Sequence, residues 1–299
     1  MIYIFFLSLL LRKGIDAGEL LATAFLIGIF FTSISYLLSA KSKPIFEDKK
    51  AQKKEFLLLI FIIFYFALFI TFYYDLLNFI QILKVKESPI RKEVIGIAKL
   101  LFIVIIPMLI YYFVYGFKLK DWGINLSSKS YFSKQNLLIF FIFSVIILAF
   151  QYFIGNGAKP LRQGLFSGRQ ILIGLFFSYI WLLLTVGIVE EFFFRAFLQS
   201  RISVLLKSEI GGVILSAMIF GLAHAPGIYL RGGGVIANLG SNPSLLISLS
   251  YSFLVLSVAG FFLSVIWLKT KNYWLIVTIH ASVDVLPNLT SFIELWGIK

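Results

Sequence analysis

Residues 171–189 read ILIGLFFSYIWLLLTVGIV and contain no charged side chain. A helix needs about 20 apolar residues to cross the hydrocarbon core of a bilayer, and this run is long enough. Because the run is continuously apolar rather than alternating, it predicts a helix and not a strand of a membrane barrel. Seven other runs have the same character, some with a single charge or a few polar residues: 18–38, 56–74, 94–117, 136–154, 210–225, 245–268 and 273–290. The sequence therefore predicts an all-α, polytopic transmembrane helix bundle of about eight spans.

The composition agrees with an integral, multi-pass membrane protein. Of the 299 residues, 60% are hydrophobic and 14% are charged, whereas about 25% are charged in a soluble domain. The net charge is +13, and most Lys and Arg residues lie in short loops between apolar runs. This placement suits membrane lipid headgroups and topology signals, so we expect no nucleic-acid partner. Cysteine is absent, which excludes disulfides and thiolate chemistry.

The loops give a direction to the predicted spans. The first apolar stretch, 2–11, is too short to cross, and Arg12 and Lys13 follow it instead of preceding it as in a secretory signal. We expect a short N-terminal interfacial helix there. The loop 41–55 holds six lysines, which places it in the cytoplasm by the positive-inside rule. The basic residues Lys84, Lys86, Arg91 and Lys92 would then lie on the opposite face.

The two parts of the chain, 1–170 and 171–290, differ in how many ionisable residues their apolar runs contain. Residues 1–170 contain few ionisable groups within spans and are predicted to be packing helices that form a scaffold. Residues 171–290 carry ionisable side chains inside or beside the apolar runs, and we interpret them as the functional core. The Gly-rich loop 226–244, with Arg231, Gly232, Gly233 and Gly234, is predicted to be an irregular re-entrant or surface segment. We find neither an internal repeat nor a soluble second domain.

The first cluster of charges in the core is Glu190, Glu191 and Arg195. Adjacent carboxylates on a helix point about 100° apart, so they do not both face one centre. Arg195 follows Glu191 by four residues, which is within reach of an ion pair. We therefore expect Glu191 and Arg195 to form a structural pair, and Glu190 to face a cavity and transfer protons. The plain alternative is that both carboxylates are interfacial charges at a helix end.

Two further clusters contain both histidines of the chain. Phe220 and His224 lie four residues apart on one helical face, as do His280 and Asp284. Each pair has a structural interpretation, as a hydrogen-bonded core histidine or a His–Asp contact between helices. However, burying so many polar groups in apolar spans is unfavourable unless they satisfy one another or surround water. The sequence predicts that the clusters converge on one water-containing site.

The three motifs E-E-x-x-x-R, F-x-x-x-H and H-x-x-x-(N or D) occur here in that order over roughly 171–288. This order resembles the CAAX-protease and bacteriocin-processing family (CPBP, or ABI), which includes the eukaryotic Ras-converting CAAX endopeptidase. The resemblance implies an intramembrane endopeptidase that acts on a membrane-associated or lipidated protein or peptide. It further implies a prokaryotic cell-membrane protein, with bacteriocin processing or immunity among the possible settings.

The resemblance also implies roles for individual residues. Glu190 would activate a water, His224 would hold that water, and His280 and Asp284 would lie opposite, near the scissile carbonyl. Glu191, Arg195 and Phe220 would support the site. Many family members have Asn where this chain has Asp284, and an ionised Asp cannot donate a hydrogen bond to an oxyanion. Asp284 is therefore either protonated or orients His280.

Three questions stay open at this level. No cofactor is favoured, but Glu190, His224, His280 and Asp284 are also a plausible ligand set for zinc (Zn). A proton-coupled transporter or a non-catalytic immunity or scaffold protein would also carry buried acids and histidines. The depth of Glu190 is the third question. A long, tilted helix that continues from 171 toward Lys207 would bring Glu190 to the depth of His224.

Overall fold

The computed structural model describes residues 2–15, 17–39, 48–79, 89–124, 129–232 and 239–299. Of the residues named above, Lys84, Lys86, Gly233 and Gly234 lie outside these ranges, as do residues 41–47 of the lysine-rich loop. The described residues are helical apart from turns and connecting segments. Eight helices among them are long and apolar enough to cross a membrane. The all-α, polytopic fold is thus confirmed, and the protein is a multi-pass integral membrane protein.

The observed spans match the eight apolar runs, with moderate changes at their ends. They comprise Leu20–Ser39, Glu55–Tyr73, Pro89–Tyr115, Lys134–Phe153, Gly168–Leu206, Glu209–Arg231, Leu245–Thr270 and Tyr273–Trp296. A short apolar helix, α1 (Ile2–Arg12), precedes them where the interfacial helix was predicted. The fifth span has 39 residues and ends at Leu206, which agrees with the longer of the two alternatives that the sequence left open for this helix.

The chain folds into two compact units, each made of several segments that are separated in the sequence. The first unit contains Met1–Thr71, Leu119–Gly123 and Phe194–Asn272. The second contains Phe72–Lys118, Ile124–Phe193 and Tyr273–Lys299. The sequence-based division at residue 170 concerned scaffold and core roles, and it stays a prediction.

In the first unit, α12 (Glu209–Leu222) packs along α15 (Ser257–Thr270). Small residues allow this approach, because a Cβ atom at Gly260 would lie 2.8 Å from Cδ1 of Phe220. The helix formed by α2 (Ala17–Ala22), Thr23–Phe31 and α3 (Thr32–Ser39) covers α15. The remaining helices of this unit are α4 (Glu55–Phe79), which continues into the second unit, α11 (Ser200–Leu206), α13 (Ala225–Arg231) and α14 (Leu245–Tyr251).

A buried ionic cluster holds the segment before α4 in the first unit. Arg201 on α11 and Glu55 at the start of α4 are almost fully buried, and Arg201 Nε and Nη2 donate to the two oxygens of Glu55 at 2.5 and 2.9 Å. Arg201 Nη1 also donates to the carbonyl of Lys49 at 2.7 Å. Lys271, after α15, bonds Asp48 at 2.7 Å. Paired groups of this kind fix the segment, because either partner alone would be a buried, uncompensated charge.

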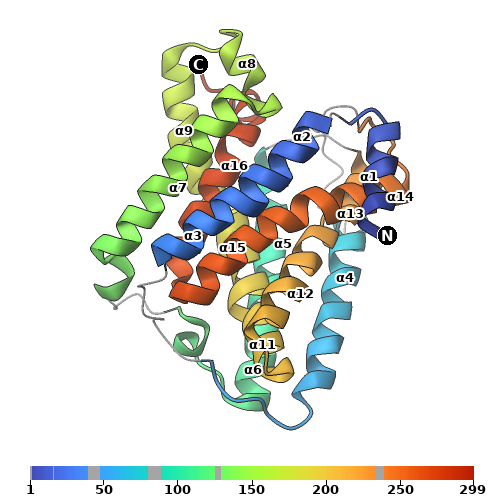
Figure 1. Cartoon of the computed structure of the whole chain (residues 1–299), viewed down its shortest axis with the longest axis vertical. Helices are drawn as coiled ribbons and strands as arrows, with labels where there is room; N and C mark the ends of the chain where they lie inside the picture. Colours follow the sequence, from blue (N-terminus) through green and yellow to red (C-terminus); the bar gives the residue numbers. More distant parts are fainter. Residues whose placement is uncertain (1, 16, 40–47, 80–88, 125–128, 233–238) are drawn as a thin grey trace. The chain divides into compact units, whose positions relative to one another are not determined.

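The second unit is built around α16 (Tyr273–Trp296), which packs against α7 (Lys134–Phe153) and α9 (Gly168–Leu182). Helix α9 starts with a capping box, in which Ser167 and Gln170 satisfy each other's backbone groups. It continues through wide turns at Leu183–Gly187 into α10 (Ile188–Glu191). The unit also contains α5 (Pro89–Lys99), α6 (Ile106–Tyr115) and α8 (Lys159–Arg162). Figure 1 shows α7, α9 and α16 running alongside one another.

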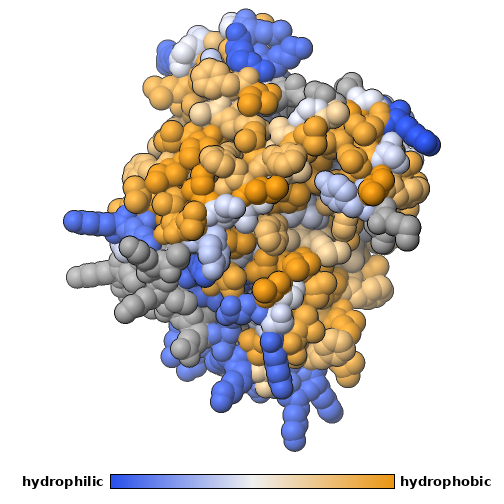
Figure 2. Space-filling view, viewed as in Figure 1, coloured by the Kyte–Doolittle hydropathy of each residue, from blue (hydrophilic) through white to orange (hydrophobic). Residues whose placement is uncertain are grey.

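The surface of the second unit has the polarity expected of a membrane protein. Figure 2 shows hydrophobic residues over α7 and α9 and hydrophilic residues at the α8 end. The exposed side chains on these helices include large apolar ones such as Phe141, Leu172 and Phe176, each at least 59% exposed. Exposed apolar side chains of this kind are favourable in contact with lipid acyl chains, whereas the basic residues of α8 suit the headgroup region.

Candidate active site

Two close contacts hold α10 against α16 in the second unit. A Cβ atom at Gly187 would lie 2.9 Å from the carbonyl oxygen of Val277, so a side chain there would push the helices apart. Tyr273, at the start of α16, donates its hydroxyl proton to the carbonyl of Ile188 at 2.7 Å. The carboxylates that follow Ile188 are therefore placed beside the second turn of α16, where His280 lies.

His280 is the centre of this cluster, with a carboxylate on each side of its ring. Nδ1 lies 2.5 Å from Oε1 of Glu191. Nε2 lies 3.5 Å from Oδ2 of Asp284 and 4.0 Å from Oε2 of Glu190. The four residues come from α10 and α16, and the sequence predicted all four as site residues.

The burial of the cluster is graded across the ring. The Glu191 side chain is 0% exposed and the His280 side chain 4%, whereas those of Glu190 and Asp284 are 16% and 28% exposed. Glu191 is thus enclosed behind the ring, and the Nε2 edge is the edge that a solvent molecule or a ligand can approach.

The contact with Glu191 fixes the protonation pattern of the ring. An ionised carboxylate accepts hydrogen bonds only, so Nδ1 carries a proton that it donates to Glu191. Nε2 is then directed at Glu190 and Asp284. A carboxylate behind an imidazole is a common way to hold the ring orientation and tautomer at a reactive site. Because Glu191 already holds the ring at Nδ1, Asp284 at Nε2 is not needed to orient His280, which favours the other predicted possibility, a protonated Asp284.

A second group of predicted residues lies in the first unit. The guanidinium of Arg195 is buried 4.4 Å from the centroid of the Phe220 ring and donates to the carbonyl of Gly260 at 3.2 Å. The ring of Phe220 lies 5.0 Å from the ring of His224. His224 Nδ1 lies 2.9 Å from the carbonyl oxygen of Phe220. A carbonyl can only accept, so Nδ1 is the donor and Nε2 is the nitrogen available for other partners.

His224 occupies the junction of two helices, α12 and α13, within the span Glu209–Arg231. It follows α12 and caps α13, in which Pro226 occupies the first turn. The expectation of an irregular segment from 226 is wrong for 226–231, because Pro is well tolerated in a first helical turn and the apolar residues after it continue the helix. The chain leaves this helix at Gly232, whose φ of +86° favours glycine.

The structure thus groups Glu190, Glu191, His280 and Asp284 in one unit, and Arg195, Phe220 and His224 in the other. The pairing of Glu191 with Arg195 and the meeting of Glu190 with His224 stay predictions. The sequence motifs predict neither the Glu191–His280 contact nor the contribution of Tyr273. Tyr273 precedes His280 by seven residues, so helical periodicity places both on one face and could have suggested it.

The predicted zinc ligands are divided between the units in the same way. Across the part of the chain that the structure describes, no group of three His, Asp or Glu side chains has the arrangement of a metal site. The predicted zinc set, which combines His224 of the first unit with three residues of the second, stays a prediction.

The geometry places the predicted motif residues of α10 and α16 around one imidazole, and a comparison with protein families bears on what this means. Residues 172–286 match the type II CAAX prenyl endopeptidase Rce1-like family. This Rce1-like segment starts in α9 and ends in α16, and it contains all seven predicted site residues. The resemblance to the CAAX endopeptidases is confirmed over this segment. No curated protein and no solved structure matches the chain significantly.

Proposed function

We propose that this protein is an intramembrane endopeptidase that hydrolyses a peptide bond with a water activated by Glu190. The observation that carries the proposal is the contact of buried Glu191 with His280 Nδ1, which directs Nε2 to Glu190 and Asp284. The Rce1-like match over 172–286 supports the same chemistry. The matching family is one of CAAX-type proteases, and the role of each residue in this chain is our proposal.

In the proposed reaction, Glu190 accepts a proton from a water that His224 also holds. The oxygen of this water attacks the scissile carbonyl, and the C–N bond breaks when the proton passes from Glu190 to the leaving nitrogen. His280 stabilises the oxyanion through a proton on Nε2 while Glu191 holds the opposite edge of the ring. Asp284 contributes a donor when it is protonated, which is the role of Asn in the resembling family.

The alternative mechanism uses zinc held by Glu190, His224, His280 and Asp284. A metal would lower the pKa of the bound water and polarise the carbonyl. The carboxylate behind His280 is compatible with both mechanisms, because ligand histidines also donate their second N–H to carboxylates. We favour the metal-free reaction, since the sequence has no H-E-x-x-H pair of ligands.

We further propose that the substrate is a membrane-associated or lipidated protein or peptide in a prokaryotic cell membrane. Spans with exposed apolar side chains suit entry of such a substrate from the bilayer. The segment 226–244 would border the entrance, because it is rich in glycine and starts just after His224 in the chain. Replacing Gly232–Gly234 by alanine should then change the preference among substrates, and unchanged preference would count against this role.

The test is cleavage of a lipidated membrane peptide by the purified full-length protein in detergent. Glu190→Gln and His224→Ala should each lower kcat by at least about a hundredfold, since general-base catalysis contributes about 10²–10⁴. Arg169→Gln, at an exposed position near the start of α9, is a control that should leave kcat unchanged. Wild-type rates in both active-site variants would refute the proposed mechanism. Metal analysis and chelator treatment of the same samples separate the two mechanisms, because removal of the metal abolishes cleavage only if zinc takes part in it.

A further inference from the structure

Two cavities in the second unit share three aromatic residues, Trp181, Phe292 and Trp296. The first has a volume of about 420 Å³ and is also lined by Lys92, Asn288 and Ser291. The second has a volume of about 510 Å³ and adds apolar residues of α9 and the turn after it, among them Ile180 and Leu184. Neither is lined by Glu190, Glu191, His280 or Asp284, so both lie outside the proposed catalytic cluster.

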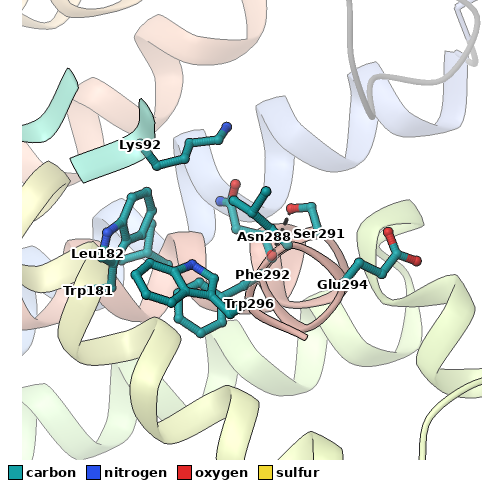
Figure 3. Close-up of a pocket in the computed structure, with 9 residues that line it drawn as sticks. Lys92, Trp181, Leu182, Asn288, Ser291, Phe292, Glu294 and Trp296 are labelled. Carbon is teal, nitrogen blue, oxygen red and sulfur yellow. Dashed lines mark hydrogen bonds between the residues drawn. The ribbon is translucent and has the colours of Figure 1, made fainter. Parts of the chain in front are cut away.

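The first cavity combines an aromatic wall with a cation and an amide, and the carboxylate of Glu294 also belongs to its lining. Figure 3 shows Lys92 extended above the indoles of Trp181 and Trp296, with its Nζ on the side of Asn288 and Ser291. Asn288 Nδ2 donates to the carbonyl of Asp284 at 2.8 Å, and the amide carries a second hydrogen that this bond does not use. An ammonium and an amide N–H are the donors that bind a phosphate oxygen.

The second cavity is lined mainly by apolar residues, with Glu93 and Thr185 as its polar ones, and it reaches the outer surface of the span Gly168–Leu206. Its residues Phe177, Ile180 and Leu184 are 55%, 40% and 53% exposed. Side chains exposed on a spanning helix face acyl chains in a bilayer. Trp181 separates the polar from the apolar lining, and its Nε1 donates to Glu93 at 2.8 Å, which fixes the indole in this position.

The first cavity also lies at the level where headgroups are expected. Lys92 belongs to the first turn of α5, whose first residue begins the span Pro89–Tyr115. Trp296 is the last residue of the span Tyr273–Trp296. Lysine and tryptophan are typical at the boundary between hydrocarbon and water, where the ammonium reaches phosphate and the indole contacts both regions.

We propose that the two cavities form one binding site for a glycerophospholipid. Its phosphodiester would bind Lys92 and Asn288, and an acyl chain would occupy the apolar cavity beside Ile180 and Leu184. Each volume is within the range of small-molecule sites, about 300–1,000 Å³. The proposal does not depend on protease activity, because it concerns residues that take no part in the proposed reaction.

The test is titration of the detergent-solubilised full chain with dioleoyl phosphatidylglycerol, with bound lipid counted by native mass spectrometry. The wild type should retain one lipid more tightly than any other. Lys92→Gln should weaken this lipid by about tenfold or more, because a charge-assisted hydrogen bond is lost. Ile180→Trp, which fills the apolar cavity, should weaken it as well. Lys99→Gln, two turns further along the same span, should bind as the wild type does.

Other arms of the experiment identify the ligand. Inorganic phosphate should not displace the lipid, and dioleoylglycerol, which lacks phosphate, should bind at least about tenfold more weakly. Equal affinity in the wild type, Lys92→Gln and Ile180→Trp would overturn the proposal, as would displacement by phosphate alone. Displacement by a peptide substrate that depends on Lys92 would assign the cavity to peptide instead. If Lys92→Gln does not fold, as judged by its Tm, the Ile180→Trp variant decides.

Discussion

Replacement of Glu191 by Gln tests the carboxylate behind the His280 ring. Glu191 Oε1 and His280 Nδ1 are 2.5 Å apart, and both side chains are almost fully buried. Gln has nearly the same size and still offers an oxygen to Nδ1, so the packing of α10 on α16 should persist. What is lost is the charge: a hydrogen bond to a charged group contributes about 1.5–3 kcal/mol, and a neutral one about 1 kcal/mol.

The difference of about 0.5–2 kcal/mol corresponds to a fall in kcat of about two- to thirtyfold if the His280 ring is more strongly held in the transition state. KM should change by less than about twofold, because Glu191 is enclosed and does not contact substrate. Initial rates over a range of peptide concentrations separate the two constants, and thermal unfolding of the same samples reports the fold.

Glu209→Gln is the matched control, since Glu209 is exposed in the first turn of α12, away from the proposed chemistry. It should leave kcat at the wild-type value. The reasoning is refuted if Glu191→Gln retains wild-type kcat with an unchanged Tm. Losing the charged hydrogen bond also lowers Tm, so kcat is measured well below the Tm of each variant, where a fall in kcat reports on the folded protein alone.

Three further predictions concern the packing and the site. Arg201→Ala should lower the free energy of unfolding by about 3–5 kcal/mol, because it leaves Glu55 buried without its partner. The double variant Arg201→Ala/Glu55→Ala should lose less stability than the sum of the two single variants, and additive losses would contradict this. Gly187→Ala should cost about 1–3 kcal/mol by pushing α10 from α16, while Gly168→Ala, with open space at its Cβ, should not; equal unfolding curves for both would argue against the close approach. Asp284→Asn should keep kcat within about threefold of the wild type, because the Asn amide can donate the same hydrogen bond. Asp284→Ala should lower kcat by about tenfold or more. Equal losses of kcat in the two variants would mean that the charge of Asp284 is required.

The spans could be predicted because their signal is local and strong. A run of about 20 apolar residues has few alternatives to a spanning helix, so each of the eight runs became one. The residues at which each helix begins and ends could be predicted less closely. The fifth helix continues past Glu190 because Phe192, Phe193 and Phe194, which follow the two carboxylates, are all buried and extend the apolar packing.

The site could be predicted in its membership more than in its contacts. Glu190, Glu191, His280 and Asp284 were found because ionisable groups are rare in apolar runs. The partner of Glu191 could not be found in that way, since helical spacing reveals neighbours on one helix, such as Arg195, but not a residue on α16. The contact with His280 depends on how closely Gly187 and Tyr273 bring the two helices together. The cavity at Lys92 likewise joins α5, α9 and α16, which are far apart in the sequence.

The central claim is that Glu190 and His224 hold the same water, and cross-linking measures their proximity directly. The chain has no cysteine, so Glu190→Cys combined with His224→Cys supplies a single pair on a clean background. A short dithiol-reactive linker, added to the protein in detergent micelles, should join the two positions, and protease digestion should then release a linked peptide. The pair Asn288→Cys and His224→Cys should link far less, because Asn288 lies two turns beyond His280. Efficient linking of the 190–224 pair would support the shared site, whereas linking no better than the control pair would contradict it.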